Sequence, residues 1–370
     1  MHILLLPSWY PTETDDVGGS FFREQGQALA RYGHRVSVFA RHKADIRGYE
    51  VKKAGEGSFT EYHIHYHLLR LPVTFLYVVW IMVRLMRTEL RRDRPDIIHV
   101  HSVAAVKYAR VLRLLFGIPY VVTEHSSRVK RKMGPREIRR LRCFYDSAEA
   151  VIAVSEGLKE HMHALTAREI LVIPNMVDPR FLDAPLRSPA AERFRYVFVG
   201  GLNAAKGLDN LLTAFAEIHG RDRDTELVLC GDGEERENLL RRIGELSLSD
   251  SVLLRGQVSR ERCAQEILDG HALVLPSRTE TFGVVCAEAL ACGRPIVMTK
   301  TDAWRSLVTP ETGLAVEIGD VRGLANAMES LRRQYDFYHP ETIRAYCRER
   351  FSPEMVCRRV TRVYEDVLGR

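Results

Sequence analysis

Short apolar runs alternate along the whole chain with segments whose apolar positions recur every three or four residues. A short apolar run between turn residues is typical of a buried strand, and the longer spacing is typical of an amphipathic helix. The clearest helical stripe lies in residues 208–218, where the apolar positions are Leu208, Leu211, Leu212, Phe215 and Ile218. Repeated alternation of this kind predicts mostly parallel sheets with helices on both faces.

Twelve runs are predicted as strands, six in each half of the chain. They are residues 3–6, 36–40, 97–100, 120–123, 151–154, 171–173, 196–199, 226–230, 252–254, 272–275, 295–298 and 313–316. Two successive sets of βα units predict two doubly wound, Rossmann-like α/β domains, of residues 1–180 and 190–352. Residues 178–195 hold three prolines and no apolar period, so they are the expected linker. Such sheets bind ligands at the carboxyl ends of their strands, and two facing each other form a cleft.

Composition fits a soluble globular protein, with 46% hydrophobic and 28% charged residues. The net charge of +6 is uneven: residues 1–180 carry 28 Lys and Arg against 19 Asp and Glu, or +9, whereas the rest carries 26 against 29, or −3. The basic first half indicates an anionic partner, which could be lipid, a phosphorylated substrate or nucleic acid. Nucleic acid is disfavoured because no recognised binding module is present.

Seven scattered cysteines without a C-x-x-C pair fit a reducing cytosol. The opening residues 1–7 lack a basic start and read as a first strand rather than a signal peptide. The longest apolar stretch, residues 71–86, is interrupted by Arg84 and is shorter than the roughly 20 residues of a membrane helix. A cytoplasmic protein is expected. Basic residues flank apolar ones in residues 70–94, and residues 128–142 are strongly basic, so peripheral association with the inner face of a membrane remains open.

Residues 276–290 form the most informative stretch, because a glycine-bearing loop connects a buried strand to a helix. The N–H groups of Gly283 and Val284 at a helix start suit a phosphate, since they and the helix dipole carry positive charge. Glu280 in the loop and Glu288 in the helix suit sugar hydroxyls, which carboxylates bind in charge-assisted hydrogen bonds. A solvated loop acid and a helix-start acid are the plain alternative. The combination favours a nucleotide-sugar site.

Two other glycine-rich turns follow strands. The turn at residues 199–207 contains Lys206, which suits a departing phosphate but could equally be a solvated lysine. Gly18 and Gly19 precede a helix expected from Phe21; they permit close backbone approach to a ligand, or form a flexible loop with Ser20 as the cap. No G-x-G-x-x-G occurs there, which argues against a dinucleotide.

With these motifs in order, the chain resembles a family 4 retaining glycosyltransferase of the GT-B fold, of the type that builds bacterial polysaccharides or glycolipids. The resemblance rests on Glu280 and Glu288 eight residues apart and on residues 198–207, 227–234, 96–101, 122–125, 153–155 and 173–178. It implies hexosyl or N-acetylhexosaminyl transfer from a nucleoside-diphosphate sugar to a hydroxyl acceptor, such as a lipid-linked or polysaccharide intermediate. A nucleotide-sugar epimerase of the same architecture and a non-catalytic scaffold that docks on membranes are the alternatives.

The resemblance also implies roles for individual residues. His125, Glu280 and Lys206 would be catalytic, with Glu280 and His125 on the transferred sugar and Glu288 on the ribose. The donor-binding set would be Gly19, Gly201, Asn203, Lys206, Val258, Arg278, Thr281, Phe282, Gly283, Val284 and Glu288. The family usually has arginine where this chain has Gly201, and Arg278 is the candidate substitute. No cofactor is implied beyond the donor, and the absence of a D-x-D pair near the site favours metal independence.

The same resemblance implies that residues 1–180 bind the acceptor, that residues 190–352 bind the donor, and that a C-terminal helix, residues 353–370, crosses back to the first domain. His99 and His101 point to one face of a strand, a spacing that could hold a metal ion. A metal site requires three or more ligands, and the sequence places no third one, so packed or hydrogen-bonded imidazoles are expected.

Overall fold

The computed structural model describes residues 1–12, 18–70 and 72–370. The chain divides into two compact units, which are described separately. The first unit contains residues 1–174 together with 356–370, and the second contains residues 175–355. Leu71, the first residue of the longest apolar stretch, lies outside the described residues.

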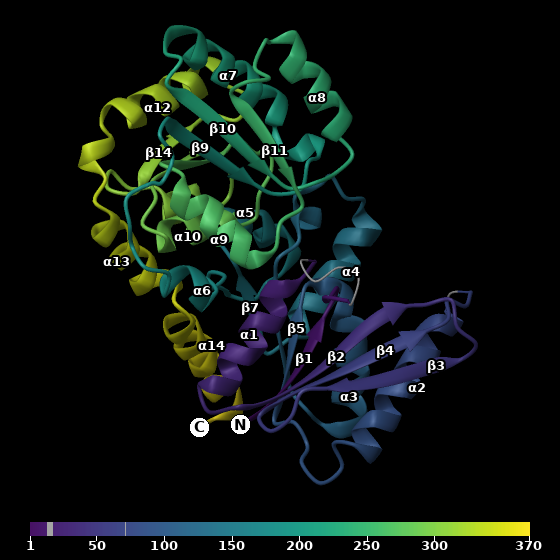
Figure 1. Cartoon of the computed structure of the whole chain (residues 1–370). Helices are drawn as coiled ribbons and strands as arrows, with labels where there is room; N and C mark the ends of the chain where they lie inside the picture. Colours follow the sequence, from purple (N-terminus) through teal and green to yellow (C-terminus); the bar gives the residue numbers. More distant parts are fainter. Residues whose placement is uncertain (13–17, 71) are drawn as a thin grey trace. The chain divides into compact units, whose positions relative to one another are not determined.

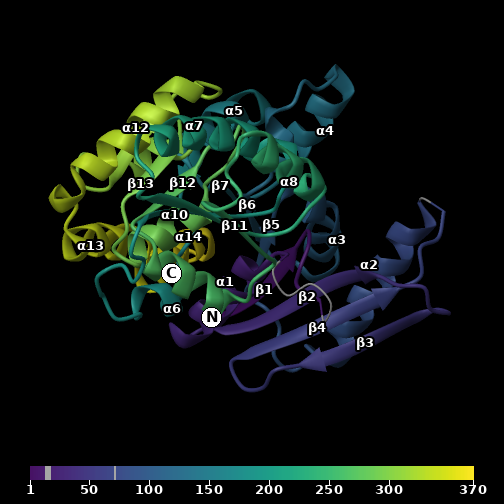
Figure 2. The ribbon, with the colours of Figure 1, turned by 45° about the horizontal axis from the view of Figure 1, so that its top comes forward.

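The first unit is built on an eight-stranded sheet in the order β3-β4-β2-β1-β5-β6-β7-β8. Its strands are β1 (His2–Pro7), β2 (Arg35–Lys43), β3 (Tyr49–Ala54), β4 (Phe59–Tyr66), β5 (Ile97–His101), β6 (Tyr120–Glu124), β7 (Ala150–Ala153) and β8 (Ile170–Val172). All pairings are parallel except that of β3 with β4. Figure 1 and Figure 2 show β3 at one edge, beside β4 and β2.

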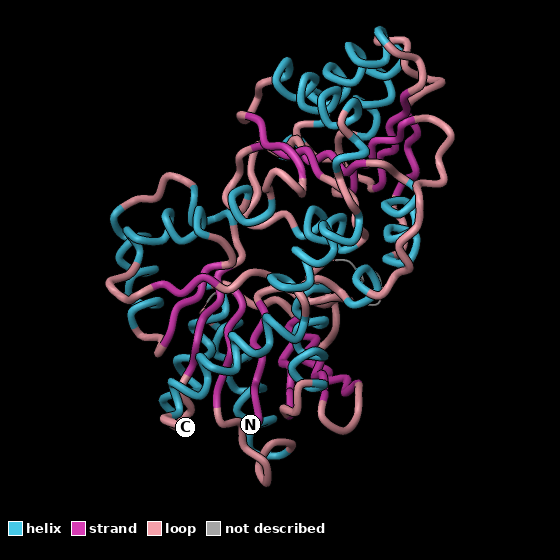
Figure 3. Tube along the Cα trace, turned by 90° about the vertical axis from the view of Figure 1, so that its left-hand side faces the viewer, coloured by secondary structure: helices cyan, strands magenta, loops and turns pink. Residues whose placement is uncertain are grey.

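Helices cover both faces of this sheet, as the tube view shows (Figure 3). They are α1 (Ser20–Arg31), α2 (Val73–Thr88), α3 (Val106–Phe116), α4 (Pro135–Asp146), α5 (Glu156–Met162) and α14 (Pro353–Leu368). The last helix enters the core of the first unit from the far end of the sequence. The hydroxyl of its fully buried Tyr364 lies 2.5 Å from His99 Nδ1, and the hydroxyl of Thr361 lies 2.8 Å from His34 Nε2.

The second unit has a six-stranded parallel sheet in the order β11-β10-β9-β12-β13-β14. Its strands are β9 (Phe194–Val199), β10 (Thr225–Cys230), β11 (Val252–Gly256), β12 (Ala272–Leu275), β13 (Ile296–Thr299) and β14 (Gly313–Val316). Its helices are α6 (Pro179–Leu182), α7 (Leu208–Arg221), α8 (Arg236–Glu245), α9 (Arg260–Asp269), α10 (Val284–Ala291), α11 (Trp304–Leu307), α12 (Val321–Arg333) and α13 (Pro340–Phe351).

All twelve predicted strands are confirmed, because each overlaps a strand of the structure. The predicted helical stripe is confirmed as well, since its five apolar residues are all buried in α7. Three expectations were incomplete or wrong. The edge strand β3 and its neighbour β4 were not predicted, the expected linker contains α6 with Phe181 and Leu182 buried, and α1 begins at Ser20 with Gly19 as its N-cap.

The longest apolar stretch forms α2, which is buried on one side only. In the part of the chain that the structure describes, no helix is both long and apolar enough to span a bilayer. All seven cysteines are free, and six of them are buried.

Candidate functional site

Each sheet has one place where the strand order reverses. In the second unit β9 lies between β10 and β12, and in the first unit β1 lies between β2 and β5. Helices leave such neighbouring strands toward opposite faces, which opens a crevice at their carboxyl ends where doubly wound sheets bind ligands. The residues singled out by sequence lie at these two places.

In the second unit, the loops after β9 and β12 are held together by backbone contact. Arg278 N–H donates to the carbonyl of Ala205 over 2.8 Å. Gly207 has a φ of +64°, and a Cβ atom there would lie 2.4 Å from the carbonyl oxygen of Pro276. Only glycine combines this backbone conformation with such a close approach. The two loops are therefore fixed relative to each other.

This contact brings Lys206 and Glu280 together across 74 residues of sequence. The Lys206 ammonium forms an ion pair with Glu280 Oε1, and Ser277 Oγ donates to the same oxygen over 3.0 Å. The side chains retain 23% and 15% exposure, so both are within reach of a ligand. The sequence identified these two residues separately, and the structure makes them one charged pair.

The helix after this loop is α10, whose N-cap is Gly283 in the left-handed conformation with a φ of +81°. The first turn of a helix leaves backbone N–H groups without helical partners, so the start of α10 is electropositive. Cys286 on α10 is fully buried, and its thiol lies close enough to Glu280 and Lys206 to feel both charges; burial is the main cause of its raised pKa. The ion pair and the helix start are thus neighbours.

Glu288 lies in the next turn of α10 and is almost completely buried. Its Oε1 lies 2.7 Å from Arg260 Nη1, and the Arg260 guanidinium in turn lies over the Phe181 ring at 4.9 Å. Burial raises the pKa of Glu288, while the charge of Arg260 opposes that rise. The carboxylate is therefore held in place by a cation that sequence analysis did not single out.

Several predicted donor residues already have intramolecular partners. Arg278 donates to the Asp209 carboxylate at 2.6 and 2.8 Å and to the Ala204 carbonyl at 2.5 Å. The Asn203 side chain accepts from the N–H of Ala205 over 3.1 Å, which caps the short turn before Lys206. The Phe282 ring is buried against Phe351 at 5.6 Å, so a ligand can meet only its backbone.

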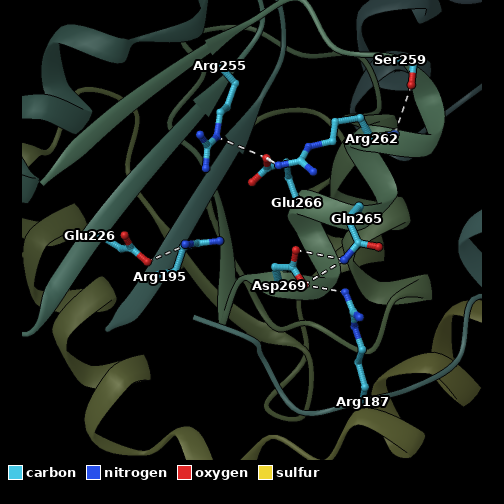
Figure 4. A network of polar contacts seen from close by, with 9 residues as sticks. All are labelled: Arg187, Arg195, Glu226, Arg255, Ser259, Arg262, Gln265, Glu266 and Asp269. Carbon is cyan, nitrogen blue, oxygen red and sulfur yellow. Dashed lines mark hydrogen bonds and ion pairs between the residues drawn. The ribbon is translucent and has the colours of Figure 1, made fainter. Parts of the chain in front are cut away.

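Gly201, Val258 and Thr281 are at least partly exposed in the second unit. Val258 lies in the loop between β11 and α9, and Figure 4 shows the polar network that anchors both ends of that loop. Arg255 and Arg262 form ion pairs with the same oxygen of Glu266, which is fully buried. Because one arginine precedes the loop and the other follows it, Glu266 fixes the backbone around Val258.

In the first unit, three histidines meet at the carboxyl ends of β5 and β6. His101 Nδ1 lies 3.1 Å from His125 Nε2, and His99 Nε2 lies 2.7 Å from Thr123 Oγ1. Burial lowers the pKa of His99 to about 3 and holds that of His101 well below its ordinary value. The His99 and His101 imidazoles are therefore neutral and hydrogen-bonded.

Glu124 shapes the turn that carries His125 and was not singled out by sequence analysis. This fully buried carboxylate accepts from the backbone N–H groups of Val103, His125 and Ser126 at 3.0, 3.0 and 2.8 Å, and from the Tyr145 hydroxyl at 2.6 Å. The sequence signal that could have identified Glu124 is a carboxylate at the end of a strand, next to a histidine. Glu124 orients the segment that carries His125.

The glycines after β1 lie beside the same histidines. Gly19 has a φ of +82°, and a Cβ atom there would lie 2.9 Å from Trp9 Cδ1. The neighbouring rings of Phe21 and Phe22 lie 5.3 and 5.0 Å from the His125 ring. Gly19 and His125 therefore lie close to the same aromatic side chains in the first unit, whereas the other predicted site residues belong to the second unit.

Comparison with known proteins covers both units. Residues 18–181 match the model described as Glycosyltransferase Family 4, and residues 187–349 match the model described as Glycosyl transferases group 1. The chain is 29% identical to the alpha-D-kanosaminyltransferase of Streptomyces kanamyceticus over 69% of this chain and 72% of that protein. It is 28% identical to the phosphatidyl-myo-inositol mannosyltransferase of Mycolicibacterium smegmatis over 97% and 93%.

The fold has close counterparts among solved structures. The structure of Anabaena HepE in complex with UDP superimposes with a TM-score of 0.76 at 18% identity, covering 99% of this chain and all of that one. The two Rossmann-like domains of the GT-B fold predicted from sequence are confirmed by this match.

Proposed function

This chain belongs to the family 4 glycosyltransferases, retaining enzymes that transfer a sugar from a nucleotide-sugar, and we propose that its donor diphosphate binds at the start of α10 beside Lys206. The observation that carries the proposal is the Lys206–Glu280 ion pair at the strand-order reversal of the second unit. A cation, a helix N-terminus, a loop acid and a helix acid lie there, which is the chemistry that a nucleotide-sugar requires.

The ion pair provides a reason for donor binding to organise the site. In the structure, the Lys206 ammonium forms an ion pair with the Glu280 carboxylate and neutralises its charge. An arriving diphosphate carries more negative charge than one carboxylate, so it attracts Lys206 toward its own oxygens. Glu280 is then available to accept hydrogen bonds from hydroxyls of the transferred sugar. Glu288, held by Arg260, accepts from the ribose.

The reaction breaks the bond between the anomeric carbon and the diphosphate oxygen and forms a bond from that carbon to the acceptor oxygen. Negative charge grows on the diphosphate as the first bond breaks, and Lys206, Arg278 and the N–H groups of α10 stabilise it. The acceptor proton passes to a leaving phosphate oxygen. Attack from the same face as departure gives retention, and no residue is placed as a covalent nucleophile.

His125 is proposed to contact the transferred sugar from the first unit. Its imidazole could donate or accept a hydrogen bond with a sugar hydroxyl. Gly19 allows the backbone to approach the ligand closely.

The acceptor is proposed to be a lipid-linked or polysaccharide intermediate, bound by the first unit. Support comes from the basic character of residues 1–180 and from the mannosyltransferase relative, whose name specifies a phosphatidyl-myo-inositol substrate. The kanosaminyl relative, at similar identity, is named for a different transferred sugar, which indicates that the sugar varies within the family. Family membership argues against the epimerase alternative, and a donor incubated alone should yield no new sugar epimer.

The test is Lys206→Ala, assayed with UDP-, GDP- and ADP-sugars. Loss of one charge that stabilises the transition state is expected to lower transfer about 10²–10³-fold. The matched control is Lys300→Ala, which removes a lysine from the exposed pair with Glu317 in the same unit and should leave the rate unchanged. Transfer by the Lys206 variant at the control's rate would remove Lys206 from the proposed site.

A further inference from the structure

An open groove of about 700 Å³ lies in the first unit where α2, α3 and α4 meet. Its walls combine aromatic and basic side chains. Phe75 comes from α2, Lys107, Arg110, Arg113 and Leu114 from α3, and Phe144 from α4. Helices α2 and α4 belong to the two basic regions noted in the sequence, residues 70–94 and 128–142, and Figure 2 shows α2 and α3 in the same part of the first unit.

Each basic side chain of the groove lies near an aromatic ring. Lys107 Nζ is 5.3 Å from the centre of the Phe75 ring, and Arg110 Cζ is 5.7 Å from that of Phe144. Within the described ranges 1–12, 18–70 and 72–370, Arg113 is the only basic residue of α3 that forms an ion pair with a carboxylate, that of Glu149. Lys107 and Arg110 are therefore available to an anion from outside.

The positive charge of the protein is concentrated in this region. Residues 103–147 contain 11 Lys and Arg against 3 Asp and Glu, a net charge of +8. The entire chain carries +6, so the remainder has a slight negative excess. Helix α3 and the turn after it contain no acidic residue at all. A surface of this kind attracts an anionic partner over a Debye length.

Exposed apolar side chains lie on the rim of the groove and elsewhere on the same two helices. Leu114 on its rim is 84% exposed, and the next residue, Leu115, is 52% exposed. On α2, Leu76 follows the groove residue Phe75 and is 61% exposed, and Trp80 one turn later is 50% exposed. Large apolar residues near a basic groove suit the surface of a lipid bilayer, where charged headgroups lie next to the hydrocarbon layer.

We propose that the α2–α3–α4 groove and its rim dock the first unit on an anionic phospholipid bilayer. Lys107 and Arg110 bind headgroup phosphates in the groove, while Leu114 and Leu115 enter the boundary between headgroups and acyl chains. A nucleic acid would use the charges but not the exposed leucines. This surface is separate from the sites for sugar transfer, so the proposal stands independently of the transfer chemistry.

The experiment is co-sedimentation of the full chain with vesicles of equal parts phosphatidylglycerol and phosphatidylcholine, and with vesicles of phosphatidylcholine alone. Binding to the anionic vesicles only is expected. The double variant Lys107→Gln with Arg110→Gln should weaken binding to the anionic vesicles about 25-fold, because each charge contributes about fivefold. Leu114→Ser with Leu115→Ser should weaken it by about tenfold or more, because buried apolar area is lost.

The matched control is Leu240→Ser with Arg241→Gln, a leucine and a neighbouring arginine on α8 of the second unit; Leu240 is 43% exposed. It should bind vesicles like the unchanged protein. Thermal melting establishes that every variant is folded, which is expected since the leucines are exposed. Absent or equal binding to the two vesicle types would overturn the proposal. So would an unchanged affinity of the leucine variant, or displacement from vesicles by single-stranded RNA at equal phosphate concentration.

Discussion

The two strand-order reversals of this protein have the same topology but opposite electrostatic character. The site in the second unit is built from ion pairs, Lys206 with Glu280 and Arg260 with Glu288. The site in the first unit is built from hydrogen-bonded imidazoles among aromatic rings. The topology is the same in both cases, and side chains decide what each place can bind.

Burial explains how the first site remains neutral. His99 is completely buried, and desolvation lowers its pKa to about 3. In the second unit, Lys206 and Glu280 remain partly exposed, so a charged ligand can reach them. The difference is consistent with the proposal that the diphosphate binds in the second unit and neutral hydroxyl groups in the first.

The largest expected effect concerns the buried ion pair of the second unit. Glu288→Ala leaves the Arg260 guanidinium without its carboxylate, and breaking a buried pair destabilises by about 3–5 kcal/mol. Urea unfolding near neutral pH measures the change. The control is Glu317→Ala, which breaks the exposed pair with Lys300 and should change the free energy of unfolding by less than about 1 kcal/mol. Equal losses in both variants would contradict the account of a structurally held Glu288.

A smaller effect distinguishes the glycines of the two sites. Gly207 and Gly19 both have positive φ, so alanine strains each backbone by about 1 kcal/mol. At Gly207 the new Cβ would also meet a carbonyl oxygen of the fixed loop, whereas at Gly19 it would meet Trp9, a partly exposed side chain that can move.

Gly207→Ala is therefore expected to destabilise by about 2–4 kcal/mol, because backbone must shift, and Gly19→Ala by about 1–2 kcal/mol. Urea unfolding of the two variants compares them directly. A greater loss for Gly19→Ala would mean that the loops of the second unit are not locked by their backbone contact.

The smallest effect is the pH dependence of the first site. The folded-state pKa of His99 is depressed from about 6.5 to about 3, so protonation favours the unfolded chain. The contribution of His99 is fully present above pH 6.5 and is lost as pH falls toward 3, by about 1.4 kcal/mol per pH unit at most.

His99→Gln keeps a hydrogen-bonding side chain but removes the titrating imidazole. Between about pH 6 and 4.5, the free energy of unfolding of this variant should therefore fall less steeply, by up to about 1.4 kcal/mol per pH unit. The exposed His163→Gln serves as the control and should leave the pH profile unchanged. Identical slopes in both variants would show that His99 is not the buried neutral group described here.

Strands and loops of the sites were predictable because local signals define them. Buried parallel strands are continuous apolar runs, and Gly283 marks the start of α10. The edge strand β3 and its neighbour β4 were missed because they are rich in charged residues, histidine and tyrosine, so no apolar run identifies them. Their pairing depends on backbone hydrogen bonds and on neighbours that the local sequence does not show.

The partners of the site residues could not be predicted, because they are distant in sequence. Arg260 reaches Glu288 from another helix, and Asp209 holds Arg278 from 69 residues away. Such pairs are set by how βα units pack side by side. The residue types in the sequence predicted where a phosphate could bind. The structure adds which of the charged side chains there already have an oppositely charged partner.

The most direct test of the central claim is a crystal structure of the protein with a nucleoside diphosphate. The account predicts diphosphate oxygens within hydrogen-bonding distance of the N–H groups of Gly283 and Val284 and of Lys206 Nζ, with Glu280 released from its ion pair. A diphosphate bound away from the start of α10, with the Lys206–Glu280 pair intact, would contradict it.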